Sequence, residues 1–389
     1  MSRYHSYLRS AKEILGLYKG QEPFAAFIKK FFAGYKKFGS SDRKQISHLC
    51  YCYFRVGRSI PAVETEQRII TALFLCSTEP NKLLGELKPE WNDKASLVIS
   101  DKIEMIDQPG LPDTIFPWVG ELSDGIDAPA FSLSHLQQPD LFLRLRPGKK
   151  EIIKQKLQAA GVQFTAVTDT CLSLPNSSKI DELIELDKEA VVQDYSSQQV
   201  GSFFQYLQTS NTGFSVWDCC AASGGKSIMT KDILGEIDLA VSDVRESIMV
   251  NLKKRFAIAG IKEYKSFITD LAKPVSNLND RKFDLIIADV PCSGSGTWGR
   301  TPEQLFYFDG KKIDEYAALQ KKIVENVMPH LAPGGHLLYI TCSVFKKENE
   351  EAIALLKEQF HLQVIKIELL KGYDKKADTM FAALLKKPL

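Results

Sequence analysis

The sequence predicts an α/β protein in which a doubly wound, mostly parallel sheet follows an all-helical region and a small α+β module. From residue 190 onward, short apolar runs alternate with helical patterns at the spacing of a parallel sheet. Residues 1–138 instead carry apolar side chains at helical spacing, and the pattern changes at residue 139. We therefore expect three parts, over residues 1–138, 139–190 and 191–389.

The first part is predicted to be helical. Apolar residues recur every three or four positions over residues 6–34 and 41–78, and Ser40-Ser-Asp42 offers helix caps before the second block. An acidic continuation interrupted by prolines extends to about residue 135.

The second part is predicted to be a β-α-β module. Residues 141–146 alternate like a strand, 149–160 form a basic helix, and 162–167 form another strand. Four basic side chains in this module could hold phosphates or form a solvated edge: Arg144, Arg146, Lys149 and Lys150.

The third part contains the predicted sheet. We expect parallel strands over residues 216–218, 238–242, 266–268, 283–288 and 336–340, with an antiparallel edge over 364–367 and 380–384. The intervening helices are expected over residues 227–234, 248–259, 313–330 and 348–357.

Composition and cysteine spacing exclude several classes of protein. No apolar run reaches the roughly 18 residues of a membrane span, and the first residues lack the apolar core of a secretory signal, so we expect a cytoplasmic protein with no membrane partner. The eight cysteines are irregularly spaced, which argues against a disulfide framework. Cys50/Cys52 and Cys219/Cys220 are too close for usual zinc pairs, so no metal is expected.

The distribution of charge is more informative than the net charge of +2. Residues 1–60 hold 12 Lys/Arg against 3 Asp/Glu, and residues 141–160 hold 6 against 1, whereas residues 61–140 hold 5 against 14. Basic regions can bind a phosphate backbone, although long helices also carry charge simply to remain solvated.

A glycine turn and a series of acids predict a ligand site. Gly224-Gly225 follows the strand over 216–218, and early strands end at Asp218, Asp243, Asp270 and Asp289. Ligands of open sheets bind beyond the carboxyl ends of the strands, where an acid can accept hydrogen bonds from ribose. The turn is not Gly-x-Gly-x-x-Gly, but a nicotinamide and a sulfonium cofactor both remain possible occupants at this point.

Two cysteines follow neighbouring predicted strands, in Asp289-Val-Pro-Cys292 and Thr341-Cys342-Ser343. A cysteine taken alone is usually a small buried hydrophobe. Two thiols beside a carboxylate at the mouth of a cofactor site instead indicate a catalytic role.

Together with Cys220-Ala-Ala-Ser-Gly-Gly-Lys226, these two motifs resemble the RsmB/Nol1/NSUN family of RNA cytosine-5 methyltransferases over about residues 190–389. The resemblance implies a Rossmann-like class I methyltransferase domain, and residues 140–190 resemble the family's small preceding domain. Residues 41–58 resemble the NusB-type RNA-binding domain. Ser223 departs from the family, which usually has proline there, and proline would stiffen the turn.

The resemblance also implies a role for each motif residue. Cys342 would be the nucleophile, Cys292 would help release the product, and Asp289 would lie between cofactor and base. S-adenosylmethionine would bind through Asp243 at its ribose, Asp270 near its adenine, and the run Cys220, Ala221, Ala222, Ser223, Gly224, Gly225 and Lys226.

The chemistry of cytosine supports such a site. Carbon 5 becomes nucleophilic only after a thiolate adds to carbon 6, and the target base must leave its stack to reach the pocket. Trp298 and Arg300, just beyond Cys292, could hold RNA, although Trp298 could instead belong to a core. We expect a monomeric methyltransferase acting on carbon 5 of cytosine in RNA, most plausibly ribosomal. The alternatives are a methyltransferase for protein or small molecules and a noncatalytic ribosome-assembly factor.

Overall fold

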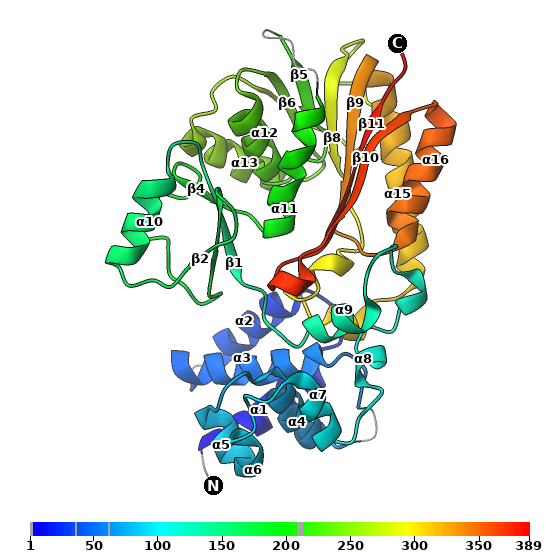
Figure 1. The fold of residues 1–389 in the computed structure, drawn as a ribbon. Coiled ribbons are helices and arrows are strands. Elements are labelled where there is room, and N and C mark those ends of the chain that lie inside the picture. Colours follow the sequence, from blue (N-terminus) through cyan, green and yellow to red (C-terminus); the bar gives the residue numbers. More distant parts are fainter. Residues whose placement is uncertain (1–2, 36, 61–62, 208–212) are drawn as a thin grey trace. The chain divides into compact units, whose positions relative to one another are not determined.

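The computed structural model describes residues 3–35, 37–60, 63–207 and 213–389 (Figure 1). The chain divides into two compact units. The helical unit comprises residues 1–120, 126–138 and 297–310, and the sheet unit comprises residues 121–125, 139–296 and 311–389. Residues 121–125 and 297–310 therefore belong to a different unit from their neighbours in sequence.

The helical unit is organised around α3 (Ser40–Arg55), which packs against α1 (Arg3–Leu17) and α4 (Thr65–Cys76). Ile46 and Leu49 of α3 are fully buried, as the helical spacing predicts. Asp42 accepts a hydrogen bond of 2.9 Å from the backbone N–H of Gly39 and so caps the start of α3. The other helices of this unit are α2 (Phe24–Gly34), α5 (Lys82–Leu87), α6 (Pro89–Asn92), α7 (Ile99–Met105), α8 (Leu111–Thr114), α9 (Ala128–Ser134) and α14 (Gln304–Tyr307).

Residues 297–310 supply aromatic side chains to the core of the helical unit. The ring of Trp298 is 1% exposed and lies 5.7 Å from the ring of Phe116, 5.3 Å from Trp118 and 4.8 Å from Phe308, measured between centroids. Of the two interpretations of Trp298, the core one is therefore correct, because a buried ring is not available to stack on RNA.

The sheet unit begins with a small antiparallel sheet in the order β2-β3-β1-β4. Its elements are β1 (Leu141–Leu145), α10 (Lys150–Ala159), β2 (Thr165–Ala166), β3 (Cys171–Leu174) and β4 (Ala190–Val192). The predicted β-α-β module is thus present, but β3 and β4 were not anticipated. Both are short, and their pairing with β1 rather than their own sequence makes them strands.

The large sheet has seven strands in the order β10-β11-β9-β8-β5-β6-β7, and this topology confirms the predicted doubly wound α/β fold. The strands from β9 to β7 pair in parallel, whereas β11 pairs antiparallel with both β9 and β10. The strands are β5 (Ser215–Asp218), β6 (Asp238–Asp243), β7 (Lys265–Ile268), β8 (Phe283–Asp289), β9 (Leu331–Thr341), β10 (Gln363–Leu370) and β11 (Met380–Lys386).

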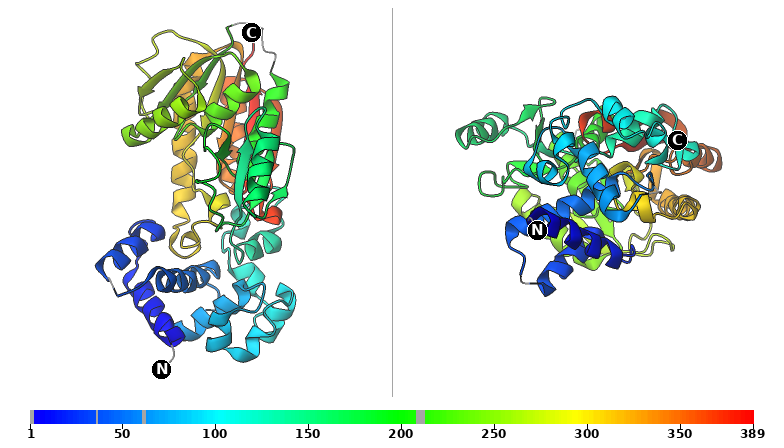
Figure 2. Two further views of the ribbon diagram at one scale, coloured as in Figure 1. Left: turned by 90° about the vertical axis from the view of Figure 1, so that its left-hand side faces the viewer. Right: turned by 90° about the horizontal axis from the view of Figure 1, so that it is seen from below.

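Helices cover both faces of this sheet (Figure 2). Because side chains alternate along a strand, Val216 packs on one face with Ile228 and Phe256, and Trp217 packs on the other with Ile323. The first face is covered by the 3-10 helix η2 (Val200–Tyr206), which α11 (Tyr195–Gln199) precedes, and by α12 (Gly225–Leu234) and α13 (Glu246–Ala259). The second face is covered by α15 (Lys311–Val327) and α16 (Glu350–Phe360).

Strand β9 is longer than the sequence predicts. The sequence predicts a strand only from residue 336, and Pro333-Gly334-Gly335 before it would favour a turn. In the structure β9 begins at Leu331, which pairs with Phe283 of β8. A register shift between Phe283 and Leu285 accommodates the glycines. Pairing with β8 therefore overrides the turn signal of the local sequence.

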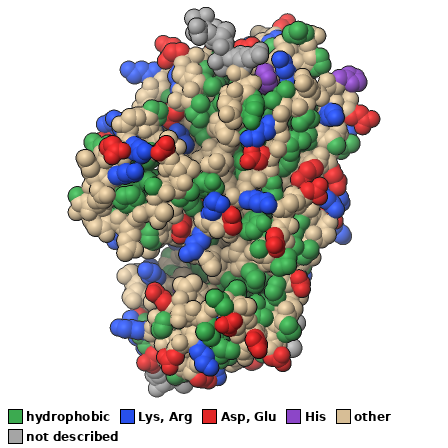
Figure 3. Space-filling view, viewed as in Figure 1, with side chains coloured by type: hydrophobic (Ala, Val, Ile, Leu, Met, Phe, Trp, Pro, Cys, Tyr) green, Lys and Arg blue, Asp and Glu red, His purple; other side chains and the backbone are tan. Residues whose placement is uncertain are grey.

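No helix within the described residues is long and apolar enough to cross a membrane. On the face drawn in Figure 3, basic and acidic side chains are interspersed.

Trp298→Ala is expected to destabilise the helical unit by about 3–5 kcal/mol, because it removes a large buried ring from an aromatic cluster. Thermal unfolding followed by near-ultraviolet circular dichroism would measure the change. Tyr35→Ala, which removes a partly exposed ring of the same unit, is the control and should have a much smaller effect. Unchanged unfolding of the Trp298 variant would contradict the core assignment.

Candidate active site

A cavity of about 510 Å³ lies in the sheet unit, beyond the carboxyl ends of β5, β6, β7, β8 and β9. This is the edge at which an open parallel sheet binds ligands. Seven of the candidate site residues predicted from the sequence line this cavity. They are Cys220, Ala222, Asp243, Asp270, Asp289, Cys292 and Cys342.

The turn between β5 and α12 brings backbone to the cavity wall. Ala222 lines the cavity with a left-handed φ of 46°, and its N–H donates a 3.0 Å hydrogen bond to Oδ2 of Asp243. Gly224 has a φ of 84°, and a Cβ at this position would lie 2.6 Å from the ring of Phe256. Only glycine fits there, because both the conformation and the close packing exclude a side chain.

The remaining residues of the run 220–226 support the turn without lining the cavity. Ala221 is buried, and its N–H donates to the carbonyl of Ser242 in β6. Gly225 begins α12. None of Ala221, Ser223, Gly224, Gly225 or Lys226 is among the residues that line the described cavity.

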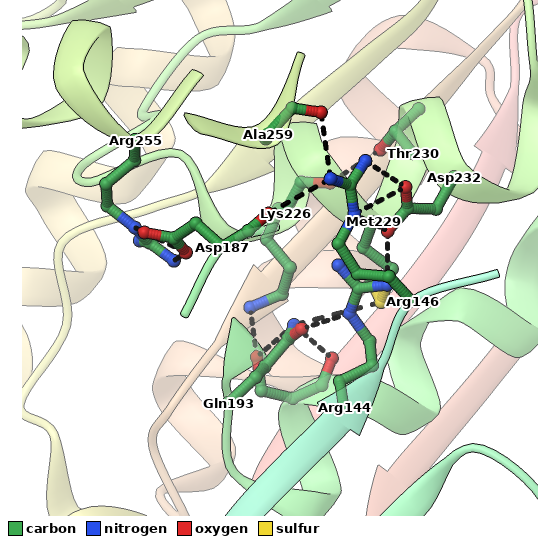
Figure 4. A network of polar contacts seen from close by, with 11 residues as sticks. Arg144, Arg146, Asp187, Gln193, Lys226, Met229, Thr230, Asp232, Arg255 and Ala259 are labelled. Atoms are coloured by element: carbon green, nitrogen blue, oxygen red, sulfur yellow. Dashed lines mark hydrogen bonds and ion pairs between the residues drawn. The ribbon is translucent and has the colours of Figure 1, made fainter. Parts of the chain in front are cut away.

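Ser223 is held by an arginine that the sequence did not single out. Nη1 of Arg255 donates hydrogen bonds of 2.8 Å to both the carbonyl and the hydroxyl of Ser223. The same guanidinium pairs with Asp187 at 2.6 Å (Figure 4). Arg255 therefore ties the turn to the segment before β4.

Basic residues of the small sheet also face inward. Arg144 and Arg146 pair with Asp232 of α12 at 2.6 and 2.8 Å, and Arg146 donates to the carbonyl of Ala259 at 2.8 Å (Figure 4). Arg144 is buried. From the sequence we considered that these two side chains either bind phosphates or form a solvated edge. Neither interpretation is correct, because both arginines anchor the small sheet to α12.

Lys226 makes an ion pair with Asp289 at the cavity, with Nζ 3.1 Å from Oδ2. Lys226 also donates a 2.7 Å hydrogen bond to the hydroxyl of Ser197. Gln193 donates to the same hydroxyl at 3.1 Å and accepts from Arg144 at 2.8 Å (Figure 4). A chain of polar contacts thus orients the amine beside Asp289.

Asp243 and Asp270 follow neighbouring strands and present carboxylates to the cavity. Burial alone would raise the pKa of Asp243, but hydrogen bonds from the side chain and backbone of Arg245 outweigh it and lower that pKa. Asp243 therefore stays ionised at neutral pH. Arg245 lies only two residues after Asp243, so the sequence itself places a cation close to this carboxylate.

The two cysteine loops meet at the cavity. The Sγ atoms of Cys292 and Cys342 are 3.0 Å apart, and both thiols are free. The backbone N–H of Cys342 donates to Sγ of Cys292 at 3.3 Å. The pKa of Cys292 is raised well above its usual value, first by the hydrogen bond with Cys342 and then by burial.

Gly296 fixes the two loops against each other. Its N–H donates to the carbonyl of Cys342 at 2.9 Å, and its own carbonyl accepts from Thr379 at 2.9 Å. A Cβ at Gly296 would lie 1.8 Å from the carbonyl oxygen of Thr379, so no side chain can replace it without moving backbone. Glu348, which the sequence gave no reason to select, also bonds to both loops.

Asp218 is buried beneath the turn. It accepts a 2.6 Å hydrogen bond from the hydroxyl of Ser227, while Oδ1 is buried without a hydrogen-bond partner in the structure. Burial raises the pKa of Asp218 to about 7. No group of three or more His, Cys, Asp or Glu side chains among the described residues is arranged to hold a metal ion.

Residues 204–385 match the family model described as 16S rRNA methyltransferase RsmB/F. The chain is 36% identical over 167 residues to ribosomal RNA small subunit methyltransferase B of Enterobacter sp. (strain 638), covering 42% of this chain and 37% of that protein. It is 34% identical over 166 residues to the protein of the same name from Salmonella paratyphi A (strain ATCC 9150 / SARB42), with the same coverage of 42% and 37%. The match thus spans a little over a third of the length of these relatives.

Solved structures share the fold. The crystal structure of PH0851 matches with a TM-score of 0.71 at 19% identity, covering 100% of both chains. The crystal structure of NSun6 from Pyrococcus horikoshii with SFG matches with a TM-score of 0.58 at 13% identity, covering 71% of this chain and 98% of that one. These likenesses support the arrangement of the elements.

Asp218 should make the protein less stable as the pH rises. Its pKa is about 7 in the folded chain and 3.8 ordinarily, so between these values the folded state keeps a proton that the unfolded chain has lost. The free energy of unfolding therefore falls over this range. Asp218→Asn should gain about 2–3 kcal/mol relative to the wild type between pH 5 and pH 8, measured by urea denaturation.

The control for this experiment is Asp280→Asn, which changes an exposed carboxyl of the same unit and should keep the wild-type pH dependence. A parallel pH dependence in the wild type and the Asp218 variant would show that Asp218 does not bind the proton.

Proposed function

We propose that this protein, whose residues 204–385 match the family model described as 16S rRNA methyltransferase RsmB/F, methylates carbon 5 of cytosine in RNA with S-adenosylmethionine as the methyl donor. The family resemblance predicted from the motifs is confirmed for this part of the chain. The observation that carries the proposal is the meeting of two free thiols 3.0 Å apart, a carboxylate and a glycine turn at one cavity.

The cavity suits S-adenosylmethionine in size and charge. A volume of about 510 Å³ is within the range of small-molecule sites. Asp243 and Asp270 line it and can accept hydrogen bonds from ribose and adenine, and the carboxylates favour a cationic sulfonium. A structural neighbour determined with SFG, an analogue of this cofactor, adds support. When bound, the cofactor supplies an electrophilic methyl group.

Cys342 is the proposed nucleophile. Its thiolate would form a bond from Sγ to carbon 6 of the cytosine as the carbon 5–carbon 6 π bond breaks, so the electron pair moves into the ring and carbon 5 becomes nucleophilic. Cys342 lines the cavity at the end of β9, next to the wall formed by Asp289. Carbon 5 then takes the methyl group.

Asp289 and Lys226 are proposed to stabilise the negative charge that builds on the ring. The pair lies at the cavity with a separation of 3.1 Å, so a proton held by either member can hydrogen-bond ring nitrogen 3. Lys226 is mostly buried, so its amine is held in place as the charge develops.

Cys292 is proposed to assist release. After methyl transfer, carbon 5 loses its proton to a base, the carbon 5–carbon 6 double bond forms again, and the bond to Sγ of Cys342 breaks. The thiol of Cys292, whose raised pKa keeps it protonated, lies 3.0 Å away and can hydrogen-bond the departing thiolate.

The substrate and setting are proposed on further observations. Curated relatives are named as ribosomal RNA methyltransferases, which supports a ribosomal RNA substrate. A base must leave its stack to enter a pocket of this kind. Eight free thiols support the reducing cytoplasm. One chain holds every residue proposed for the reaction, which supports a monomer. We also propose three domains, over residues 1–138, 139–190 and 191–389, of which the first resembles the NusB-type RNA-binding domain.

Cys342→Ala should reduce methyl transfer to background, because the base can no longer be activated. The measurement incubates purified protein and labelled S-adenosylmethionine with total RNA from a strain lacking the gene, and then counts label in 5-methylcytidine. Cys292→Ala should leave a covalent RNA–protein band on a denaturing gel, and Cys342→Ala/Cys292→Ala, the control, should lack it. Full activity of Cys342→Ala would refute the nucleophile, and RNA binding without transfer by the wild type would favour a noncatalytic factor.

Arg255→Met should weaken binding of S-adenosylmethionine about tenfold, because the carbonyl and hydroxyl of Ser223 lose a charged donor and the turn loosens. Isothermal titration calorimetry gives the dissociation constant. Lys254→Met, at the preceding exposed position of α13, is the matched control and should bind like the wild type. Equal affinity of the two variants would show that Arg255 does not support the cofactor turn.

A further inference from the structure

A buried carboxylate joins the two cysteine loops. Glu348 is fully buried at the end of the 3-10 helix η5 (Lys346–Glu348). Its Oε2 accepts a 2.9 Å hydrogen bond from the backbone N–H of Ser293, the residue after Cys292. Its Oε1 accepts a 2.7 Å hydrogen bond from the hydroxyl of Ser343, the residue after Cys342. The carboxylate of Glu348 thus accepts a hydrogen bond from each loop, at the residue that follows each cysteine.

We propose that Glu348 is a positioning residue for the methyl transfer, whose carboxylate holds the Cys292 and Cys342 loops together and disfavours a negative charge on Cys292. This inference rests on the proposed function, since it assigns Cys342 as the attacking sulfur.

The carboxylate is itself held rigidly. Gln320 of α15 donates a 2.8 Å hydrogen bond to Oε2 of Glu348 and a 3.0 Å hydrogen bond to the carbonyl of Pro291, which precedes Cys292. The hydroxyl of Tyr339 in β9 contacts the backbone carbonyl of Glu348 at 2.8 Å and Oε1 of Gln320 at 3.0 Å. Neutral side chains of α15 and β9 therefore hold Glu348 in place.

Serine hydroxyls extend the same scaffold between the loops. The hydroxyl of Ser293 donates to that of Ser343 at 3.1 Å, and the hydroxyls of Ser295 and Ser343 are 3.2 Å apart. Ser295 also accepts from the backbone N–H of Val344 at 2.9 Å. Because each loop is bonded to the other on both sides of Glu348, the carboxylate can set the separation of the two sulfur atoms.

The negative charge of Glu348 contributes to the raised pKa of Cys292, after the hydrogen bond with Cys342 and burial. The titratable groups facing Cys292 are Cys342, Glu348, Tyr316 of α15 and Tyr339 of β9. Of these, Glu348 is the nearby carboxylate, and its negative charge disfavours a second negative charge on Cys292. It acts in the same direction as the hydrogen bond with Cys342 and burial, which raise the pKa of Cys292.

The test separates charge from position. Glu348→Gln keeps the shape and an acceptor for Ser293 but removes the charge, whereas Glu348→Ala removes both. The full chain is treated with limiting iodoacetamide from pH 6 to pH 11, and initial alkylation rates at Cys292 are read by peptide mass spectrometry. We expect the midpoint of the Cys292 profile to shift down by about one pH unit in Glu348→Gln. Glu351→Gln, an exposed acid of the neighbouring helix, should keep the wild-type midpoint.

Activity provides the second readout. Glu348→Gln should lower kcat by about 10–100-fold with the KM for S-adenosylmethionine within about twofold of the wild type, because the acid contacts the cysteine loops and not the cofactor wall. An unchanged Cys292 profile in Glu348→Gln would overturn the proposal, even if Glu348→Ala did not fold. The alkylation profile needs no RNA, so it stands or falls separately from the proposed methyl transfer.

Discussion

The site depends on the parallel pairing of β8 with β9. Asp289 at the end of β8 lies opposite Ile340 near the end of β9, so both chains leave the sheet at the same level. The loops that follow carry Cys292 and Cys342, and this register brings sulfur atoms 50 residues apart in sequence to within 3.0 Å. Two hydrophobic cores constrain the register, because Leu285 and Ile287 of β8 pack in one and Ile286 and Ala288 in the other, and a slip by one residue would exchange them.

Charge around the cavity is arranged in matched pairs. Asp243 is bonded by Arg245, Asp289 by Lys226, and Ser223 on the turn is bonded by Arg255, which in turn is paired with Asp187. The hydrogen bonds of these pairs hold the side chains and their loops in place at this edge of the sheet. Asp218 differs, since its burial outweighs the charge of Lys226 and favours the protonated acid.

The two units interrupt one another in sequence. Residues 297–310 leave the sheet unit a few positions after Cys292 and add Trp298 to the core of the helical unit, while residues 121–125 join the sheet unit. There, Ser123 donates its N–H to the carbonyl of Val344 and accepts from the amide of Asn349, next to the Cys342 loop. Both cysteine loops are thus continuous with, or bonded to, segments exchanged between the units. The helical unit is therefore built from three separate segments of the chain.

The sequence alone determined the fold class, the strands of the large sheet, the glycine turn and the pair of cysteines. These follow from local signals: alternation of apolar residues, and an acid or thiol directly after a strand. Only the tertiary structure decided that β3 and β4 are strands, that Trp298 is buried, that Arg144 and Arg146 face inward, and that Glu348 bonds both cysteine loops. Each of these depends on a partner distant in sequence, and no local pattern encodes where such a partner will lie.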